Sequence, residues 1–251
     1  MPRSENTIGY VHSAFLSIEG EGNLVGTRAL FVRLAGCDIA CPYCDTPESW
    51  SAEPASFMVN YPEKILSLQN PIAAGDLISH LSPFVSDKPR YLCLTGGEPL
   101  LQTDFAYALA DLAHHKLNLP AVLETSGLYP LELEPLLTVC SRINLDIKLP
   151  SLMKGIGHWE SIRQSLSTAR DSMMQVKVVV AANTSDAEIE LAAQLVAAIE
   201  PFTPFVLQPV WSQAGFAPPD CRQLLAWQKI ALNHLQDVRV IPQIHKYLGL
   251  P

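Results

Sequence analysis

Short apolar runs alternate with amphipathic segments along most of the chain. Runs rich in Val, Ile and Leu predict strands, and apolar positions three or four residues apart predict helices between them. We expect strands at 29–34, 91–95, 121–124, 143–146, 175–180, 204–208 and 238–241, with an earlier one near 11–16. We expect helices at 104–116, 131–139, 159–170, 186–200 and 219–235. Ser185 and Glu188 form a capping-box pattern at the start of the helix at 186–200.

The regular alternation of strand and helix favours parallel strands joined by right-handed crossovers. The number of repeated units predicts an α/β fold of the (β/α)-barrel type, complete or partial, rather than a small open sheet. Residues 48–73 interrupt the pattern with Pro, Ser and Asn. We interpret residues 1–251 as a single domain with an insertion or lid at 48–73.

Composition narrows the class of protein. The chain has 251 residues, of which 48% are hydrophobic and 17% are charged, and its net charge is −8. No apolar run approaches the roughly 20 residues of a membrane span, and the first residues lack a secretory pattern. Lys and Arg are scattered, which disfavours direct binding to nucleic acid or to anionic membranes. The sequence therefore predicts a cytoplasmic enzyme that acts on a small molecule.

Polar motifs follow the ends of the predicted strands. T-G-G-E-P ends the strand at 91–95, E-T-S-G ends the next, and D-I-K and Q-P-V-W end later ones. The carboxyl ends of parallel barrel strands open on one face, where active sites lie. We therefore expect these motifs to converge in space.

Three cysteines, Cys37, Cys41 and Cys44, follow the strand at 29–34 with the spacing C-x3-C-x2-C. Structural zinc sites normally use four protein ligands, and this chain has no second cysteine pair of that kind. Three thiolates on one loop suit a [4Fe-4S] cluster with one open iron, which can take an exogenous ligand. A catalytic zinc site remains the alternative.

A cysteine triplet of this spacing, on a loop after the first strand of an α/β barrel, resembles the radical S-adenosylmethionine (radical SAM) enzymes. The resemblance implies a partial (β/α) barrel of the radical SAM type, a [4Fe-4S] cluster and S-adenosylmethionine as cofactor. In that family T-G-G-E-P lies near the methionine end of the cofactor, and E-T-S-G lies near its ribose. The cofactor-binding residues implied in this sequence are Tyr43, Cys44, Asp45, Gly96, Gly97, Glu98, Ser126, Asp146, Ile147, Lys148, Gln208, Pro209, Val210 and Trp211.

S-I-E-G-E-G (17–22), G-T-R-A-L-F-V-R-L-A-G-C (26–37) and the terminal Q-I-H-K-Y-L-G-L-P (243–251) resemble one subgroup, the 7-carboxy-7-deazaguanine synthases. This resemblance implies ring contraction of 6-carboxy-5,6,7,8-tetrahydropterin to 7-carboxy-7-deazaguanine with loss of ammonia, a step toward queuosine. It also implies Mg²⁺, a flavodoxin or ferredoxin as electron donor, and a homodimer. The substrate-binding residues implied are Ile18, Glu19, Gly20, Glu21, Arg33, Thr95, Gln243, His245 and the terminal Pro251.

Individual residues fit these roles to different degrees. Arg33 lies among apolar residues on its strand, so its charge needs a partner, and a substrate carboxylate suits it. Thr46 matches the magnesium ligand of the subgroup, and Asp45-Thr46 could cap a helix at the same time. Glu19 stands where Gln is expected in many relatives, and a carboxylate can accept hydrogen bonds from a pterin but cannot donate one. Asp146 and Lys148 could equally form a surface ion pair.

Two other functions stay open. One is a radical SAM enzyme that activates a glycyl radical protein, and the other is a non-catalytic zinc-binding protein. No side chain is predicted with certainty to be catalytic, because the cluster and S-adenosylmethionine would carry the chemistry.

Overall fold

The computed structural model describes residues 5–61, 63–211 and 215–250. A curved ten-stranded sheet forms the centre of the molecule, in the order β12-β11-β10-β9-β8-β7-β3-β2-β4-β5. A run of seven strands, from β12 to β3, is parallel throughout. These strands are β3 (Arg28–Leu34), β7 (Leu92–Gly96), β8 (Ala121–Thr125), β9 (Cys140–Ile147), β10 (Met174–Val180), β11 (Phe205–Pro209) and β12 (Val238–Val240).

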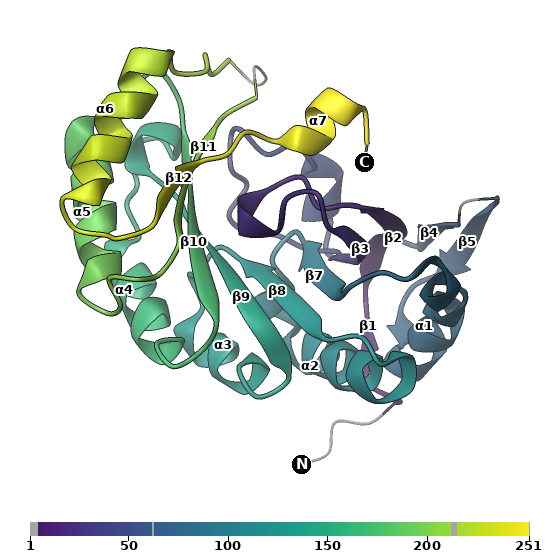
Figure 1. The fold of residues 1–251 in the computed structure, drawn as a ribbon. Coiled ribbons are helices and arrows are strands. Elements are labelled where there is room, and N and C mark those ends of the chain that lie inside the picture. Colours follow the sequence, from purple (N-terminus) through teal and green to yellow (C-terminus); the bar gives the residue numbers. More distant parts are fainter. Residues whose placement is uncertain (1–4, 62, 212–214, 251) are drawn as a thin grey trace.

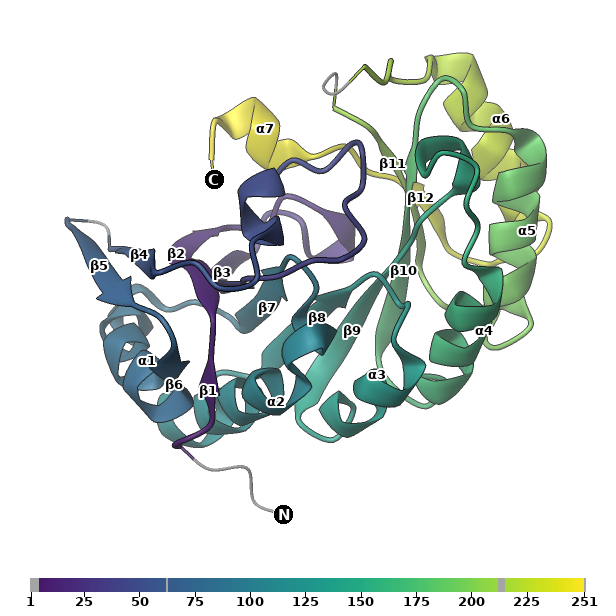
Figure 2. The same cartoon turned by 180° about the vertical axis from the view of Figure 1, so that it is seen from behind.

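Six helices cover the convex face of the sheet, and a seventh lies across its open side (Figures 1 and 2). The helices are α1 (Ala74–Leu81), α2 (Thr103–Leu112), α3 (Pro130–Leu136), α4 (Trp159–Thr168), α5 (Asp186–Ala197), α6 (Cys221–Leu232) and α7 (Ile244–Leu248). Within the described residues no strand ladder joins β12 to the opposite edge. The predicted partial barrel is therefore confirmed as an open arch. None of the helices in the described residues is long and apolar enough to cross a membrane.

The edge of the sheet beside β3 differs from the predicted all-parallel pattern. β2 (Val11–Ile18) pairs antiparallel with β3, and β4 (Ser56–Asn60) pairs parallel with β2. β5 (Ile65–Gln69) completes a hairpin with β4. The segment 48–73, predicted as an insertion or lid, thus contributes two strands to this edge. A separate two-stranded ladder joins β1 (Ile8–Gly9) to β6 (Ile72–Ala73).

Helix α1 is absent from the predictions, because its sequence carries weak helix signals. It begins at A-G-D, and its N-cap residue Ala73 makes no side-chain capping bond. In contrast, the predicted capping box of Ser185 and Glu188 is confirmed at the start of α5. The helix predicted at 104–116 is α2 followed by one π-helical turn, Ala113–Leu117.

Two apolar layers hold the arch together. The larger one lies between the sheet and its outer helices and includes fully buried Leu and Val residues from most strands. The smaller one lies on the other sheet face and consists of Phe15, Ala29, Phe31, Tyr91, Cys93 and Val122. Because side chains alternate along each strand, the residues two positions further along β3, β7 and β8 lie on this inner face as well. These residues are Arg33, Thr95 and Glu124.

Candidate active site

The loop after β3 carries the three predicted cluster ligands. Cys37, Cys41 and Cys44 are free thiols, Cys41 is buried, and the other two are half-buried. The backbone N–H groups of Ile39 and Ala40 both hydrogen-bond to the Cys37 sulfur. Ala40 takes the left-handed conformation, with φ of 48°. The loop thus turns sharply around Cys37 and presents all three sulfurs to one cavity.

Gly96 and Gly97 let the end of β7 pack directly against this loop. A Cβ atom on Gly96 would lie 2.3 Å from the Leu34 carbonyl oxygen, and one on Gly97 would lie 2.1 Å from the Gly36 carbonyl oxygen. Backbone hydrogen bonds fix the approach, since the N–H of Gly97 donates to Leu34 and that of Glu98 donates to Gly36. The two glycines therefore allow close packing of the end of β7 against the cysteine loop.

Glu98, which follows β7, is hydrogen-bonded to the end of the neighbouring strand β8. Its side chain is 1% exposed. One carboxylate oxygen accepts hydrogen bonds from the Thr125 hydroxyl and the Leu100 N–H, and the other accepts from the N–H and the hydroxyl of Ser126. Burial raises the pKa of Glu98, although these hydrogen bonds oppose that rise. In this arrangement the Ser126 hydroxyl donates to Glu98.

Most of the predicted site residues line one cavity of about 220 Å³. They are Ile18, Glu19, Gly20, Glu21, Arg33, Cys37, Cys41, Tyr43, Cys44, Asp45, Thr46, Thr95, Gly96, Gly97, Glu98, Ser126, Asp146, Lys148, Gln208, Val210, Trp211, Gln243 and His245. Pro209 is half-buried beside the cavity but does not line it. Ile147 is fully buried in the outer apolar layer, because it alternates with Asp146 and Lys148 along the chain. Pro251 lies outside the described residues.

A buried chain of charges forms one wall of the cavity. Lys177 pairs with both Glu21 and Asp146, and Lys148 pairs with Asp146 at 2.8 Å. These side chains are between 13% and 16% exposed, so Asp146 and Lys148 do form the ion pair of the alternative prediction, but this pair is largely buried and not at the surface. Burial alone would raise the pKa of Asp146, but the two lysines outweigh it and lower that pKa. The wall therefore presents fixed charges of both signs.

The C-terminal segment contacts Glu21 and also Asp45 of the cysteine loop. The Gln243 amide donates to Glu21 at 2.7 Å, and the Lys246 ammonium lies 3.0 Å from the Asp45 carboxylate. Burial opposes ionisation of Asp45, yet His245 and Lys246 lower its pKa below the usual range. A Cβ atom on Gly20 would lie 2.1 Å from the His245 ring. Residues from both ends of the sequence therefore close the same side of the cavity.

Arg33 and Thr46 face each other across the cavity mouth. The Arg33 guanidinium donates to the Thr46 hydroxyl at 3.3 Å. Thr46 precedes a short 3-10 helix, Pro47–Trp50, but among the described residues its side chain makes no capping hydrogen bond. Thr46 is therefore the N-cap residue by position, as the helix-cap prediction has it, but its hydroxyl hydrogen-bonds with Arg33 instead of capping the helix.

Several cavity residues were not predicted from the sequence: Trp50, Glu124, Asn144, Gln175, Lys177 and Lys246. A signal existed for two of them. Lys177 is a single charge within an apolar strand, as Arg33 is, and Asn144 precedes Asp146 by two positions and so shares its face. Two more, Glu124 and Lys246, belong to the motifs E-T-S-G and Q-I-H-K-Y-L-G-L-P already noted, whereas Trp50 and Gln175 have no distinctive signal.

The donor atoms of the cavity fit a cluster and a polar organic ligand. Three thiols converge on one loop, which is the ligand type of an iron–sulfur cluster. Four buried polar atoms of the lining have no hydrogen-bond partner among the described residues: Tyr43 Oη, Asn144 Oδ1, Asp146 Oδ1 and Gln208 Oε1. Since buried polar atoms are normally satisfied, these four are suited to meet a bound molecule.

The open barrel and its three-cysteine loop define a radical SAM protein, and the family model described as Radical SAM superfamily matches residues 32–195. The chain is 33% identical to 7-carboxy-7-deazaguanine synthase of Geobacter sulfurreducens, over 95% of this chain and 96% of the relative. It is 32% identical to the enzyme of that name from Archaeoglobus fulgidus, over 94% and 96% of the two chains. The chain belongs to the family of 7-carboxy-7-deazaguanine synthases within this superfamily. Membership in the superfamily implies a [4Fe-4S] cluster and S-adenosylmethionine.

Solved structures support the fold. The crystal structure of QueE from Escherichia coli superposes with a TM-score of 0.63 at 24% identity, covering 95% of both chains. A radical SAM methyltransferase from Sphaerobacter thermophilus gives a TM-score of 0.62 at 16% identity, over 86% of this chain and 66% of that one. At these sequence identities the similarity shows the shared fold alone.

Proposed function

We propose that this chain converts 6-carboxy-5,6,7,8-tetrahydropterin to 7-carboxy-7-deazaguanine and ammonia by radical ring contraction. One observation carries the proposal. In a chain that aligns almost end to end with curated synthases, the three thiols, Arg33 and both terminal segments line a single cavity. A glycyl radical activating enzyme would have no need for the C-terminal segment in that position.

Cys37, Cys41 and Cys44 hold the cluster in this proposal. When bound there, the cluster would supply the electron for reductive cleavage of S-adenosylmethionine, the chemistry that starts hydrogen abstraction. The strand ends beside the thiols hold that cofactor, with Gly96 and Gly97 offering backbone groups close to the loop and Lys148 and Gln208 lining the far wall. Tyr43 contributes the cavity face over which the Lys148 ammonium lies, 5.5 Å from its ring centre.

Arg33 binds the substrate carboxylate. Its guanidinium is planar and permanently charged, and a carboxylate can accept two parallel hydrogen bonds from it. The only hydrogen bond of its side chain among the described residues goes to the neutral Thr46 hydroxyl, so its charge is available for a ligand. Ile18, Glu19, Gly20 and Glu21 surround the pterin ring, and Gln243 and His245 close the pocket from the C-terminal side. Pro251, outside the described residues, is assigned to substrate binding on family resemblance alone.

Thr46 is the magnesium ligand of this proposal. Mg²⁺ prefers oxygen ligands and keeps several places for water or substrate, so one hydroxyl beside the substrate carboxylate suffices as a protein ligand. The position of Thr46 next to Arg33 would let the cation and the guanidinium share that carboxylate.

The remaining partners are small proteins and a second copy of the chain. A flavodoxin or ferredoxin delivers the electron, and the chain works as a cytoplasmic homodimer. These assignments rest on family membership, and neither nucleic acid nor a membrane is a direct partner.

Anaerobic reconstitution followed by an activity assay tests the function. We expect about four iron and four sulfide per chain, and conversion of the pterin to the deazapurine with dithionite, S-adenosylmethionine and Mg²⁺. Product would be identified by its absorbance and mass, and ammonia would be quantified. Zinc in place of iron would favour a binding protein, and S-adenosylmethionine cleavage without deazapurine would favour another radical SAM reaction.

A further inference from the structure

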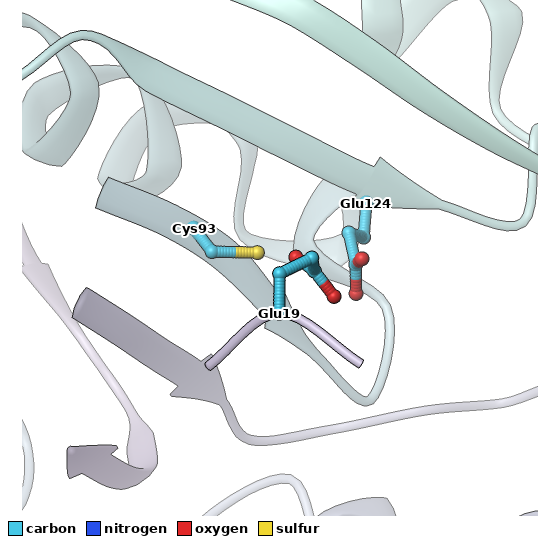
Figure 3. A group of neighbouring side chains, drawn as sticks. All are labelled: Glu19, Cys93 and Glu124. Atoms are coloured by element: carbon cyan, nitrogen blue, oxygen red, sulfur yellow. The ribbon is translucent and has the colours of Figure 1, made fainter. Parts of the chain in front are cut away.

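Two glutamate side chains meet where the cavity borders the inner apolar layer. One carboxylate oxygen of Glu19, one of Glu124 and the Cys93 sulfur all lie within 4.8 Å of one another. Figure 3 shows the Glu19 carboxyl directed at Glu124, with the Cys93 thiol on its other side. Glu19 is only 3% exposed, and both glutamates line the cavity. Two carboxylates this close, and shielded from water, oppose each other's ionisation.

The hydrogen-bond partners of the two glutamates differ. Glu19 accepts from the Tyr91 hydroxyl at 3.0 Å and from the Glu21 backbone N–H at 3.2 Å, and both donors are neutral groups. Glu124 accepts from the Thr95 hydroxyl at 2.8 Å and is attracted by the Lys177 ammonium. Within residues 5–61, 63–211 and 215–250, no cation forms an ion pair with Glu19. A negative charge is therefore better placed on Glu124 than on Glu19.

The wider surroundings of Glu19 do not reverse this preference. The titratable and charged groups that the neighbouring elements direct toward this region are Glu21, Arg33, Tyr91, Cys93, Glu124, Lys177 and His245. Lys177 forms its ion pairs with Glu21 and Asp146 and forms none with Glu19, and burial raises the pKa of the Cys93 thiol well above its ordinary value. Burial first, and then the charges of Glu124 and Glu21, raise the pKa of Glu19 to about 8.

We propose that the Glu19 and Glu124 pair carries one proton, that this proton lies on Glu19, and that the Glu19 hydroxyl donates a hydrogen bond to the heterocycle bound in this cavity. The ligand part of this inference rests on the proposed function. Two unpartnered buried atoms of the same lining, Asn144 Oδ1 and Gln208 Oε1, point independently to a polar ligand there.

A neutral acid beside a carboxylate matches the chemistry of a lactam. A lactam presents a carbonyl acceptor next to a ring N–H donor, and both the pterin and the deazaguanine contain one. Glu19 supplies the hydrogen-bond donor and Glu124 supplies the acceptor. If both glutamates were ionised, the site would offer two acceptors and would leave the ligand carbonyl opposite a negative charge, which is costly in a buried site. Glu19 thus sets specificity for the lactam form.

Binding of the product 7-carboxy-7-deazaguanine to the reconstituted protein tests the donor role. We expect its dissociation constant to be constant at low pH and to rise about tenfold per pH unit above the titration of Glu19. The variant Glu19→Gln keeps a neutral donor of the same shape, so its dissociation constant should stay level from pH 6 to 9. Glu134→Gln, an exposed change on α3, should follow the wild type. Identical profiles for wild type and Glu19→Gln would overturn the proposal, as would weaker binding by Glu19→Gln at pH 7.

Infrared spectroscopy of the ligand-free protein tests the shared proton separately. At pH 7 we expect a carbonyl band of a protonated carboxyl that is present in the wild type and in Glu134→Gln but is lost in Glu19→Gln. Absence of that band in the wild type would overturn the shared proton whatever the ligand is. If the band is present and the wild type fails to bind the product at any pH, the proposed function and the donor role fail, while the shared proton stands.

Discussion

Replacing Glu19 with Gln should make the folded protein more stable, by an amount that grows with pH. The pKa of Glu19 is about 8 in the folded protein and 4.5 as its ordinary value. Below pH 4.5 the acid is neutral in both states, so it contributes no pH dependence. Between pH 4.5 and 8 only the unfolded chain loses the proton, which favours unfolding as pH rises. Above pH 8 both states are ionised and the penalty stays constant.

The size of this effect follows from one proton. Within that window the stability of the wild type falls by about 1.4 kcal/mol per pH unit relative to Glu19→Gln. From pH 5.5 to 7.5 the gap should therefore widen by about 2.7 kcal/mol. For a chain of this length that corresponds to roughly 5–10 °C in melting temperature.

Paired thermal unfolding of the two proteins at pH 5.5, 6.5 and 7.5 measures the gap, and Glu134→Gln serves as the control for losing one carboxylate. Because both proteins are measured in the same buffer, the contributions of the titrating groups that they share cancel in the difference between their stabilities. Parallel curves for wild type and Glu19→Gln would refute the reasoning, because they would mean that Glu19 is ionised in the folded state. A stability difference between Glu19→Gln and the wild type that decreases as pH rises would refute the reasoning as well.

The remaining predictions concern the cluster loop and the substrate pocket. Cys41→Ala should abolish cluster binding, seen as loss of iron and of the reduced-cluster paramagnetic resonance signal, whereas Cys221→Ala, at an exposed cysteine, should retain both. Arg33→Lys should raise KM for the pterin by roughly 10- to 100-fold, because one bidentate hydrogen-bonded pair is lost. Arg28→Lys, at the exposed start of the same strand, should leave KM unchanged, and an equal rise in both variants would exclude a specific carboxylate contact. Gly97→Ala should lower stability by about 2 kcal/mol or more and reduce iron content, because its new methyl group would meet a backbone oxygen of the cysteine loop. Normal melting and iron content in this variant would show that the loop can move aside.

Strand and helix positions of the arch were largely predictable, because each parallel strand is a short apolar run between turn residues. The ends of the strands shifted by one to three residues, as at β9, which begins at Cys140 rather than at 143. The hairpin of β4 and β5 was missed for a physical reason. Its strands lie at the edge of the sheet, are only five residues long each and stand among Pro, Ser and Asn residues, so they are hard to distinguish from a loop.

Site residues that belong to a sequence motif were predictable. Those indicated only by the alternation of side chains along a strand were harder to find. The cysteine loop and T-G-G-E-P stand out because their residues are unusual in order and spacing. In E-T-S-G the predicted cofactor contact is Ser126, which donates a hydrogen bond to Glu98, whereas Glu124 of the same motif lines the cavity. The ion pairs of Lys177 depend on which strands become neighbours in the sheet. That information is not local in the sequence.

The period of two along the inner strands explains why the cavity ends where it does and why Glu19 is the residue held neutral. Phe31, Cys93 and Val122 form part of the inner apolar layer, and the next inward residues on the same strands are Arg33, Thr95 and Glu124. On each strand, the side chain two residues beyond the inner apolar layer is therefore polar and lines the cavity. The Glu19 carboxyl lies at this boundary. It accepts a hydrogen bond from Tyr91 and lies near Cys93, both of the apolar layer, and near Glu124 of the polar cavity lining. An acid placed there is buried, and no cation of the described residues forms an ion pair with it, so the neutral form is the one that the fold stabilises.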